Sequence, residues 1–458
     1  MKNKRVLALM MSTMMAVSLV GCSSSDSESA ETDTTATEET TETEESTDND
    51  DVITVTFWHH RGSGVQYDCV THAVETFNST IGAEKGIVVE EAYIGNYDDL
   101  YAQTSLAIQS GDTPNIVSCA NTYVPYLLED DALVNMADLD GAAEVRDNLM
   151  DWVLEIGGNT DGNLYSLPYC RSTPLFYYNK DITDELGIEI GETITIDELE
   201  AFMEAATVVD SDGTTSRYGF ELLNDFGYYN GAWIYQLGSE YMSEDGGSLS
   251  LEDGTMEQVL SDWRNWVDAG WCRPFDSTEA EDTMRSMFYN GEIASFCNSC
   301  AGLSTVLAGC EETGVNLGVA QFPTYDEDNA VSEIGGAQIE IISCDNSEEE
   351  IGASWEFIKF LMSDEEQYYN SMTSGYVPAT LSIAEYDDMV TFWEENPEFK
   401  VAYNQMLNTG RAQELPYLAV GQDFTQICSD TVSLLIAEQS ITTEEAVEQI
   451  TAESEIIW

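Results

Sequence analysis

A short polar group interrupts a stretch that otherwise has the character of a buried strand. Cys170, Arg171 and Ser172 lie between Pro168 and Pro174, and an apolar, aromatic run follows. Each proline fixes its own φ and disfavours helical geometry in the residue before it, so the stretch is predicted to be an extended crossover strand. A thiol, a guanidinium and a hydroxyl orient polar groups rather than fill a core. We therefore expect the centre of this strand to face something other than packed side chains.

The other potentially reactive residues form no catalytic or metal-binding motif. Cys297 and Cys300 have redox-like spacing, but no second cysteine pair or histidine cluster accompanies them, and the whole chain has three histidines. Residues 210–213 (Asp-Ser-Asp-Gly) depart from the spacing of a calcium loop and are predicted to form a hairpin turn. No carboxylate pair stands in a motif that requires catalysis. We expect no metal, no cofactor, no catalytic residue and no enzymatic activity.

The charge of the chain excludes some classes of binding partner. Its 458 residues carry 86 acidic and 15 basic side chains, for a net charge of −71. Phosphate backbones require a basic surface, so we expect no nucleic acid partner. Because basic residues are scarce, Arg61 and Arg171 become candidates for ligand contact wherever they lie in a cleft. For each, pairing with one of the many acids is the alternative interpretation.

The N-terminus has the pattern of an export signal. Three basic residues precede the apolar run 6–20, which is too short for a mature membrane span and ends in Leu-Val-Gly-Cys22. This ending resembles the lipobox of bacterial lipoproteins, in which Cys22 is acylated after cleavage. Residues 1–21 are therefore predicted to be a lipoprotein signal peptide, and Cys22 to attach palmitate-type chains. A signal peptide that merely ends in cysteine is the alternative.

Residues 22–51 are acidic and rich in Ser and Thr, with almost no apolar side chains. Such a segment cannot offset the entropy of ordering by burial, so it is predicted to be a disordered, extended tether. The tether and lipid together place the globular part at the extracytoplasmic face of the bacterial cell membrane. Nine cysteines remain beyond Cys22. Several stand among apolar residues, which favours buried thiols, although whether Cys297 and Cys300 pair stays open.

Alternating strands and helices follow the tether. Residues 53–58, 87–89 and 115–119 have the pattern of strands, with helical patterns between them. This order is typical of a largely parallel sheet covered by helices, in which ligands bind beyond the carboxyl ends of strands. The loops at residues 59–64 and 121–124 lie at such ends.

Longer amphipathic helices dominate the second part of the chain. They are predicted at residues 196–206, 256–269 and 278–290, with capping boxes at Ser347/Glu350, Ser363/Glu366 and Thr442/Glu445. An aromatic, glycine-containing piece spans residues 226–233 and offers rings, Trp233 among them, that could stack on a sugar. Residues 376–378 (Tyr-Val-Pro) are predicted to form a second extended crossover.

An ordered set of motifs resembles the extracellular solute-binding proteins of ABC importers. The likeness is nearer to glycerol-3-phosphate-binding members and more distant to maltose-binding members of the carbohydrate-type group. It is carried by Phe57-Trp58-His59, Gly95-Asn96-Tyr97, Ser172-Thr173-Pro174, Phe288-Tyr289-Asn290-Gly291, Ile334-Gly335-Gly336-Ala337 and Gly375-Tyr376-Val377-Pro378. The resemblance implies a type II periplasmic-binding-protein-like α/β fold, with two lobes, crossover hinge strands and a ligand cleft between them. Lobe 1 would comprise residues 52–170 and 330–376, and lobe 2 residues 171–329 and 377–458.

The resemblance also implies binding residues, one position at a time. Tyr97, Ser172, Ser299 or Cys300, Gly336 and Tyr376 fall where the glycerol-phosphate binders hold their ligand. Two positions depart from that pattern, because Asn121 stands for a glutamate and Ala419 for an arginine. The loss of a bidentate phosphate donor counts against a phosphate ligand, unless Arg171 or Arg61 replaces it.

These observations predict a monomeric, lipid-anchored receptor that captures a small polyhydroxylated solute and delivers it to the membrane subunits of an ABC permease. A sugar or oligosaccharide is the first choice of solute, and glycerol 3-phosphate or a glycerophosphodiester is the alternative. Two other classes stay open. A glycan-active surface enzyme would form product from a glycan, whereas an adhesin or scaffold would show no closure with any sugar.

Overall fold

A computed structural model describes residues 52–155, 159, 161–243, 247–275, 281–408 and 421–458. All of them belong to one compact unit, residues 50–458. The predicted signal peptide and tether lie outside the described residues. Within the described part of the chain, every helix is too short or too polar to traverse a bilayer.

The first of two five-stranded sheets has the order β2-β1-β3-β12-β4. β1 is parallel to β2 and β3, as predicted, whereas β12 is antiparallel to β3 and β4. The antiparallel strands are those that connect to the other sheet, so the sheet is less uniformly parallel than the sequence predicts. The strands are β1 (Ile53–His59), β2 (Ile87–Tyr93), β3 (Ile116–Val117), β4 (Leu167–Ser172) and β12 (Gly335–Ile341).

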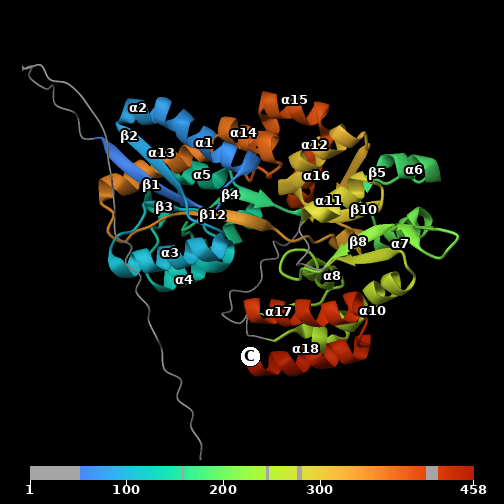
Figure 1. Ribbon diagram of the computed structural model, residues 1–458. Coiled ribbons are helices and arrows are strands. Elements are labelled where there is room, and N and C mark those ends of the chain that lie inside the picture. Colours follow the sequence, from blue (N-terminus) through green and yellow to red (C-terminus); the bar gives the residue numbers. More distant parts are fainter. Residues whose placement is uncertain (1–51, 156–158, 160, 244–246, 276–280, 409–420) are drawn as a thin grey trace, which may run out of the picture. The chain divides into compact units, whose positions relative to one another are not determined.

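Helices cover both faces of this sheet (Figure 1), since α1, α2 and α13 lie on one side and α3 and α4 on the other. Glycine or a capping side chain sets several helix ends. Ser347 and Glu350 form the predicted capping box of α13, while at α14 only the Ser363 side chain accepts from the Glu366 amide. The helices are α1 (Gly64–Ser79), α2 (Ile81–Lys85), α3 (Tyr97–Ser110), α4 (Val124–Glu129), α5 (Ala142–Asp147), α13 (Glu348–Leu361) and α14 (Asp364–Ser374).

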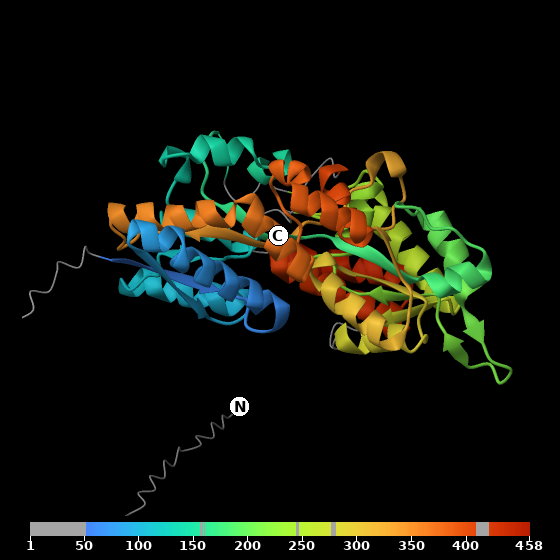
Figure 2. The same ribbon diagram turned by 90° about the horizontal axis from the view of Figure 1, so that it is seen from above.

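The second sheet has the order β11-β5-β10-β8-β9. β5 is antiparallel to both of its neighbours, and β8 is parallel to β10 and β9. A hairpin of β6 and β7 projects from this part of the chain (Figure 2), and its turn contains the predicted residues 210–213. The strands are β5 (Pro174–Asn179), β6 (Val208–Val209), β7 (Thr215–Arg217), β8 (Phe220–Leu223), β9 (Cys272–Phe275), β10 (Ser295–Ser299) and β11 (Leu317–Gln321).

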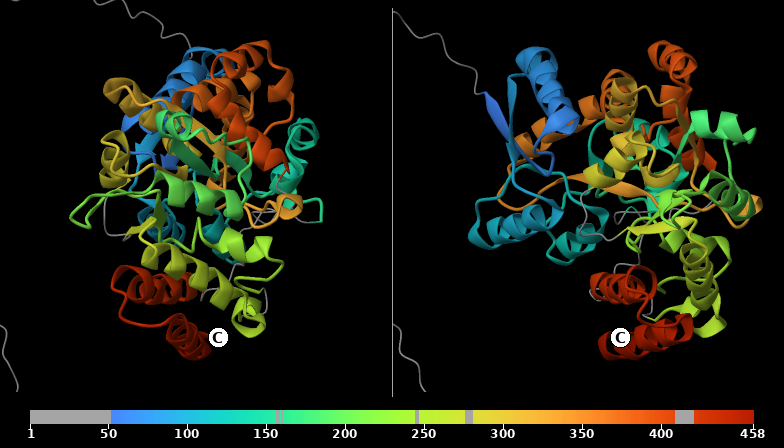
Figure 3. Two further views of the ribbon diagram at one scale, coloured as in Figure 1. Left: turned by 90° about the vertical axis from the view of Figure 1, so that its right-hand side faces the viewer. Right: turned by 45° about the vertical axis from the view of Figure 1, so that its right-hand side comes forward.

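The helices of the second sheet include the long amphipathic ones expected from the sequence. The predicted helix 196–206 coincides with α7, and α10 follows the predicted 256–269 to within one residue at each end. The two C-terminal helices lie side by side and α18 packs on α10 (Figure 3). The helices are α6 (Lys180–Leu186), α7 (Ile196–Ala206), α8 (Gly231–Gln236), α9 (Leu249–Asp253), α10 (Thr255–Asp268), α11 (Glu281–Tyr289), α12 (Leu303–Thr313), α15 (Asp387–Glu395), α16 (Pro397–Asn408), α17 (Gly421–Val432) and α18 (Thr443–Ile457).

The chain crosses between the sheets where the sequence predicts extended segments. β4 belongs to the first sheet and β5 to the second, and Thr173 alone separates them. The second crossover lies beside the first, because the Val377 amide donates to the Arg171 carbonyl at 2.8 Å. Thr173 also contacts a third connection, the segment between β11 and β12. Its Oγ1 lies 3.1 Å from Ser332 Oγ and donates to the Glu333 carbonyl. Three connections therefore lie side by side at Arg171 and Thr173.

The described cysteines are free thiols, and all but Cys344 are buried. Cys297 and Cys300 do not pair in this structure. Burial raises the pKa of the Cys300 thiol to about 12, which disfavours the reactive thiolate. The described residues contain no group of three or more side chains that could hold a metal ion.

Candidate functional site

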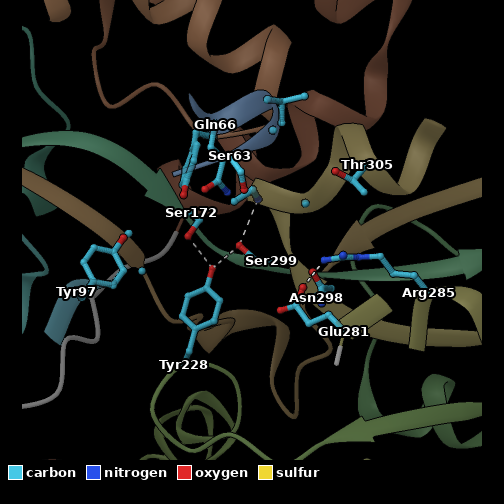
Figure 4. A pocket seen from close by; sticks show the side chains of 17 residues that line it. Ser63, Gln66, Tyr97, Ser172, Tyr228, Glu281, Arg285, Asn298, Ser299 and Thr305 are labelled. Carbon is cyan, nitrogen blue, oxygen red and sulfur yellow. Dashed lines mark hydrogen bonds and ion pairs between the residues drawn. The ribbon is translucent and has the colours of Figure 1, made fainter. Parts of the chain in front are cut away.

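A pocket of about 530 Å³ opens beside the crossover of β4 and β5 (Figure 4). Its lining comes from segments far apart in the sequence. From the first sheet and its helices come Ser63, Gly64, Val65, Gln66, Tyr97, Ser172, Gly335, Gly336 and Tyr376. From the second come Tyr228, Glu281, Arg285, Asn298, Ser299, Ala301, Gly302 and Thr305. We call these two sets the first-sheet wall and the second-sheet wall.

Hydroxyl groups link the two walls. The Tyr228 hydroxyl donates to Ser172 Oγ at 2.9 Å and lies 3.1 Å from Ser299 Oγ. The Ser299 backbone amide in turn donates to the hydroxyl of Tyr229 at 3.1 Å. Tyr228 thus brings together the two serines that the sequence predicts, with its hydroxyl between Ser172 and Ser299 (Figure 4).

Two consecutive glycines shape the pocket floor. A Cβ at Gly335 would approach the Tyr228 ring to 2.4 Å, so the absence of a side chain allows this ring to lie against the backbone. Gly336 has a φ of 99°, and a Cβ there would lie 1.8 Å from the Cys170 carbonyl oxygen. Only glycine fits this combination of conformation and contact. The Gly-Gly pair is therefore required by the pocket geometry.

Tyr97 is held in the pocket by its helix and by a histidine ring. Asn96 caps α3 by accepting the Asp99 amide at 2.9 Å, which fixes Tyr97 in the first helical turn. The Tyr97 ring stacks on His60, with 4.2 Å between the ring centroids. Burial, and then the charge of Arg61, lower the pKa of His60 to about 3, so this imidazole is neutral near pH 7. The ring behind Tyr97 is thus a flat, uncharged support.

Arg61 lies behind the pocket and not in it. Its side chain is 1% exposed, and the guanidinium carbon lies 4.7 Å from the ring centroids of both Tyr169 and Tyr376. Nη1 donates to Asn370 Oδ1 at 3.2 Å. The predicted ligand contact of Arg61 is corrected accordingly, because its guanidinium is buried against the Tyr169 and Tyr376 rings and Arg61 does not line the pocket. It supports Tyr376, which lines the pocket.

Arg171 also points away from the pocket. It pairs with Gly336 in the β4–β12 register, but its side chain is buried and its guanidinium carbon lies 5.5 Å from the Trp152 ring. Burial raises the pKa of the buried Glu340 carboxyl, and the charge of Arg171 opposes that rise. The prediction that Arg171 contacts a ligand is corrected, because its side chain lies in the interior while the next residue, Ser172, lines the pocket.

Two further predicted residues do not line the pocket, and the side chain of a third lies outside the described residues. Trp233 is 1% exposed in α8, and its Nε1 donates to the Pro323 carbonyl at 2.9 Å, so it belongs to the core. Cys300 is fully buried and its Sγ accepts the Thr173 amide at 3.4 Å, so Ser299 is the member of this pair that reaches the pocket. Asn121 begins the short helical turn Asn121–Tyr123, but its side chain lies outside the described residues.

The second-sheet wall contains polar residues that were not predicted from the sequence. Arg285 is ion-paired with Glu281 and with Asp282, the latter at 3.0 Å. Asn298 is 1% exposed, and neither atom of its side-chain amide has a hydrogen-bond partner in the described structure. Arg285 could have been found as a scarce basic residue on a predicted helix. No feature of the sequence indicates that the side-chain amide of Asn298 lacks a hydrogen-bond partner among the described residues.

Comparison with known protein families places most of this chain in a family of binding proteins. Residues 72–401 match the family described as bacterial extracellular solute-binding protein. The chain is similar to the sn-glycerol-3-phosphate-binding periplasmic protein UgpB of Escherichia coli K12, with 26% identity over 377 residues that cover 78% of this chain and 81% of UgpB.

Solved structures agree on the fold. UgpB from Mycobacterium tuberculosis, in complex with glycerophosphocholine, superposes with a TM-score of 0.74 at 20% identity, covering 88% of this chain and 98% of that one. The GacH receptor of Streptomyces glaucescens, studied with and without acarbose, gives 0.69 at 19% identity, covering 87% and 96%. These are type II periplasmic binding proteins, which confirms the predicted two-lobed α/β fold. Since the family match spans more than half of its length, the chain belongs to the bacterial extracellular solute-binding proteins.

Proposed function

We propose that this protein captures an uncharged sugar or short oligosaccharide in the pocket and delivers it to the membrane subunits of an ABC permease. The observation that carries the proposal is the composition of the pocket, in which tyrosine rings and serine hydroxyls of both walls surround about 530 Å³. Small-molecule sites have volumes of about 300–1,000 Å³. Aromatic faces and convergent hydroxyls suit the apolar faces and hydroxyl groups of a sugar.

Capture would use closure of two lobes about the crossovers. We assign residues 52–170 and 330–376 to lobe 1, and residues 171–329 and 377–458 to lobe 2. Thr173 is the natural pivot of such a motion, because Cys300 donates its amide to the Thr173 carbonyl at 3.0 Å and Gln405 donates to Thr173 Oγ1 at 2.6 Å. A few residues at element ends absorb the backbone change in hinge motions.

The proposed location is the extracytoplasmic face of a bacterial membrane. The basic start, short apolar run and Cys22 support a cleaved signal and a lipid anchor, with residues 22–51 as the tether. Mass spectrometry of the protein expressed in a bacterium checks this assignment. The expected product begins at an acylated Cys22, and Cys22→Ser should release the protein from the membrane fraction.

A glycerophosphodiester or glycerol 3-phosphate is the second candidate ligand, because Arg285 lines the pocket and could receive a phosphate. It is also the ligand class in the names of the two UgpB proteins similar to this chain. The enzyme alternative has less support, because the family and the named relatives are described as binding proteins or as a receptor.

A thermal-shift screen of the full chain tests the proposal, since a ligand that binds only the folded state raises the melting temperature. The screen contains neutral mono- and oligosaccharides, sn-glycerol 3-phosphate and glycerophosphocholine. We expect a shift with at least one sugar, together with more compact small-angle scattering. A shift with the phosphates alone would favour the second candidate. Product formation on long incubation would replace capture with catalysis, and no response to any compound would contradict a receptor role.

A further inference from the structure

The corner of the pocket between α11 and β10 contains a buried side chain with nothing to bind. Asn298 lies on β10 with 1% of its surface exposed, and both its Oδ1 and Nδ2 lack a hydrogen-bond partner among the described residues. Most buried side-chain amides in folded proteins are hydrogen-bonded. Because Asn298 lines the pocket, one donor group and one acceptor atom are available to an occupant (Figure 4).

Arg285 shares this corner. The Cβ that a side chain at Gly302 would have lies 3.3 Å from Asn298 Oδ1 and 3.4 Å from Arg285 Nη2. The two polar groups therefore border the same space, which is open because residue 302 is glycine. Arg285 Nε is also buried and without a partner in the described structure. The corner thus offers donors from two side chains beside a free amide oxygen.

The charge of the corner disfavours an anion. Arg285 Nη1 donates to Asp282 Oδ1 at 3.0 Å and Nη2 is paired with Glu281, so two carboxylates surround one guanidinium. Arg285 is the only Lys or Arg among the described residues that line the pocket. A phosphate that accepted from the unpartnered Arg285 Nε would face both of these carboxylates. A neutral hydroxyl can accept from Arg285 or Asn298 and donate to a carboxylate or to Oδ1 without that repulsion.

We propose that Asn298, Arg285 and Glu281 form a subsite that recognises two neighbouring hydroxyl groups of a neutral sugar. One hydroxyl accepts from Asn298 Nδ2 and the other donates to Asn298 Oδ1 or Glu281, with Arg285 Nε as a further donor. The subsite rests on the proposed capture function and narrows its ligand class, because it selects a diol over a phosphate ester.

Calorimetric titration of the full chain tests the subsite with glucose, D-tagatose, maltotriose, sn-glycerol 3-phosphate and glycerophosphocholine. The variants are Asn298→Ala and Arg285→Gln. Asn404→Ala is the matched control, because Asn404 donates to Glu192 at 2.8 Å and does not line the pocket. We expect a sugar to bind the wild-type chain, about a tenfold or greater loss of affinity in Asn298→Ala, and no loss in the control. Monodeoxy derivatives of the binding sugar should bind the wild type more weakly than the sugar itself does. In Asn298→Ala, the sugar and these derivatives should bind with nearly the same affinity.

The outcomes separate the two proposals. If a sugar binds and Asn298→Ala binds it equally well, capture stands and the subsite is wrong. If sn-glycerol 3-phosphate or glycerophosphocholine binds more tightly than every sugar, and Arg285→Gln abolishes that binding, the corner is an anion site and the diol proposal is overturned. If none of the five compounds binds at millimolar concentration, the diol subsite and the proposed sugar-capture function both fail. A lower melting temperature in ligand-free Asn298→Ala would identify a packing role instead.

Discussion

The two walls of the pocket are built on different principles. On the first-sheet wall, Tyr97 and Tyr376 are each backed by another side chain, the partly buried His60 in one case and the buried Arg61 in the other. On the second-sheet wall, Asn298 and Arg285 line the pocket and keep polar atoms without partners in the described structure, whereas the unpartnered atoms of His60 and Arg61 belong to side chains that do not line it. The first wall is thus fixed by its own packing, whereas the second leaves bonds to be completed by an occupant. Changes behind the first wall should mainly reduce stability, and changes in the second should mainly reduce affinity.

The largest effect on stability is expected for Arg61→Ala. This side chain is among the largest fully buried ones, and its loss leaves a cavity between the Tyr169 and Tyr376 rings. We expect the free energy of unfolding to fall by about 3–5 kcal/mol, measured by urea denaturation. Arg61→Met fills most of the volume and should lose less. If Arg61→Ala kept wild-type stability but lost ligand affinity, the guanidinium would act on the ligand after all and the comparison of the walls would break.

The next effect depends on pH and comes from the same buried region. Glu366 lines a small internal cavity with Arg61, and burial raises the pKa of its carboxyl to about 8. Because this pKa lies above the unfolded value, the folded state holds the extra proton between about pH 4.5 and 8. The contribution of Glu366 to stability is therefore full below about pH 4.5 and is lost as the pH rises through 8.

Glu366→Gln keeps the side chain neutral and should flatten this dependence. At pH 9 the variant should be more stable than the wild type by about 2–4 kcal/mol, whereas at pH 4 the two should be similar. Glu395→Gln is the control, because that side chain is exposed and is not among the groups that shift the pKa of Glu366. Urea denaturation at a series of pH values gives the comparison. Equal slopes in wild type and Glu366→Gln would show that this carboxyl is not the source.

Local features of the sequence predicted much of the fold. Capping residues and apolar periodicity depend on neighbours along the chain, so α7 and the capping boxes at Ser347 and Thr442 were predicted correctly. Proline geometry likewise placed the crossover at β4 and β5. The short β3 and the antiparallel β12 were less predictable, because the length and direction of a strand depend on partners far away in sequence.

Residues of the pocket lining were predictable where the family resemblance supplied the position, while their roles in binding stay a prediction. Tyr97, Ser172, Ser299, Gly336 and Tyr376 all line the pocket. Arg171 does not, because successive side chains of a strand point to opposite faces and neighbouring Ser172 takes the pocket face.

Composition could not separate the aromatic residues of one stretch either. Tyr228 lies in the pocket, while Trp233, five positions later, packs beside Trp263 in the core. Asn298 was missed because an unsatisfied amide becomes visible only when all of its neighbours are known.

An intermediate loss of stability is expected for Tyr228→Phe, which removes the hydroxyl that links the two walls of the pocket. The hydrogen bond to Ser172 at 2.9 Å and the contact with Ser299 at 3.1 Å would be lost, while the ring would keep its place against Gly335. We expect the free energy of unfolding to fall by about 1 kcal/mol, because the two serines face a pocket that water can enter. Tyr229→Phe, which removes one bond within the second-sheet part, is the comparison by thermal denaturation. A larger loss in Tyr229→Phe would mean that the link between the walls contributes little.

The smallest change in stability is expected for Arg285→Gln, although Arg285 is involved in two ion pairs. Glu281 and Asp282 are 49% and 88% exposed in their side chains, and exposed pairs of this kind contribute about 0–1 kcal/mol. Arg264→Gln is the matched contrast, because Arg264 also pairs with an acid one turn away but binds the Leu435 and Ile441 carbonyls as well. Urea denaturation should therefore show a larger loss for Arg264→Gln than for Arg285→Gln, whereas only Arg285→Gln should weaken sugar binding. If Arg285→Gln unfolded as readily as Arg264→Gln, Arg285 would serve the structure of the second-sheet wall, and the distinction between a packed wall and a wall completed by its ligand would not hold.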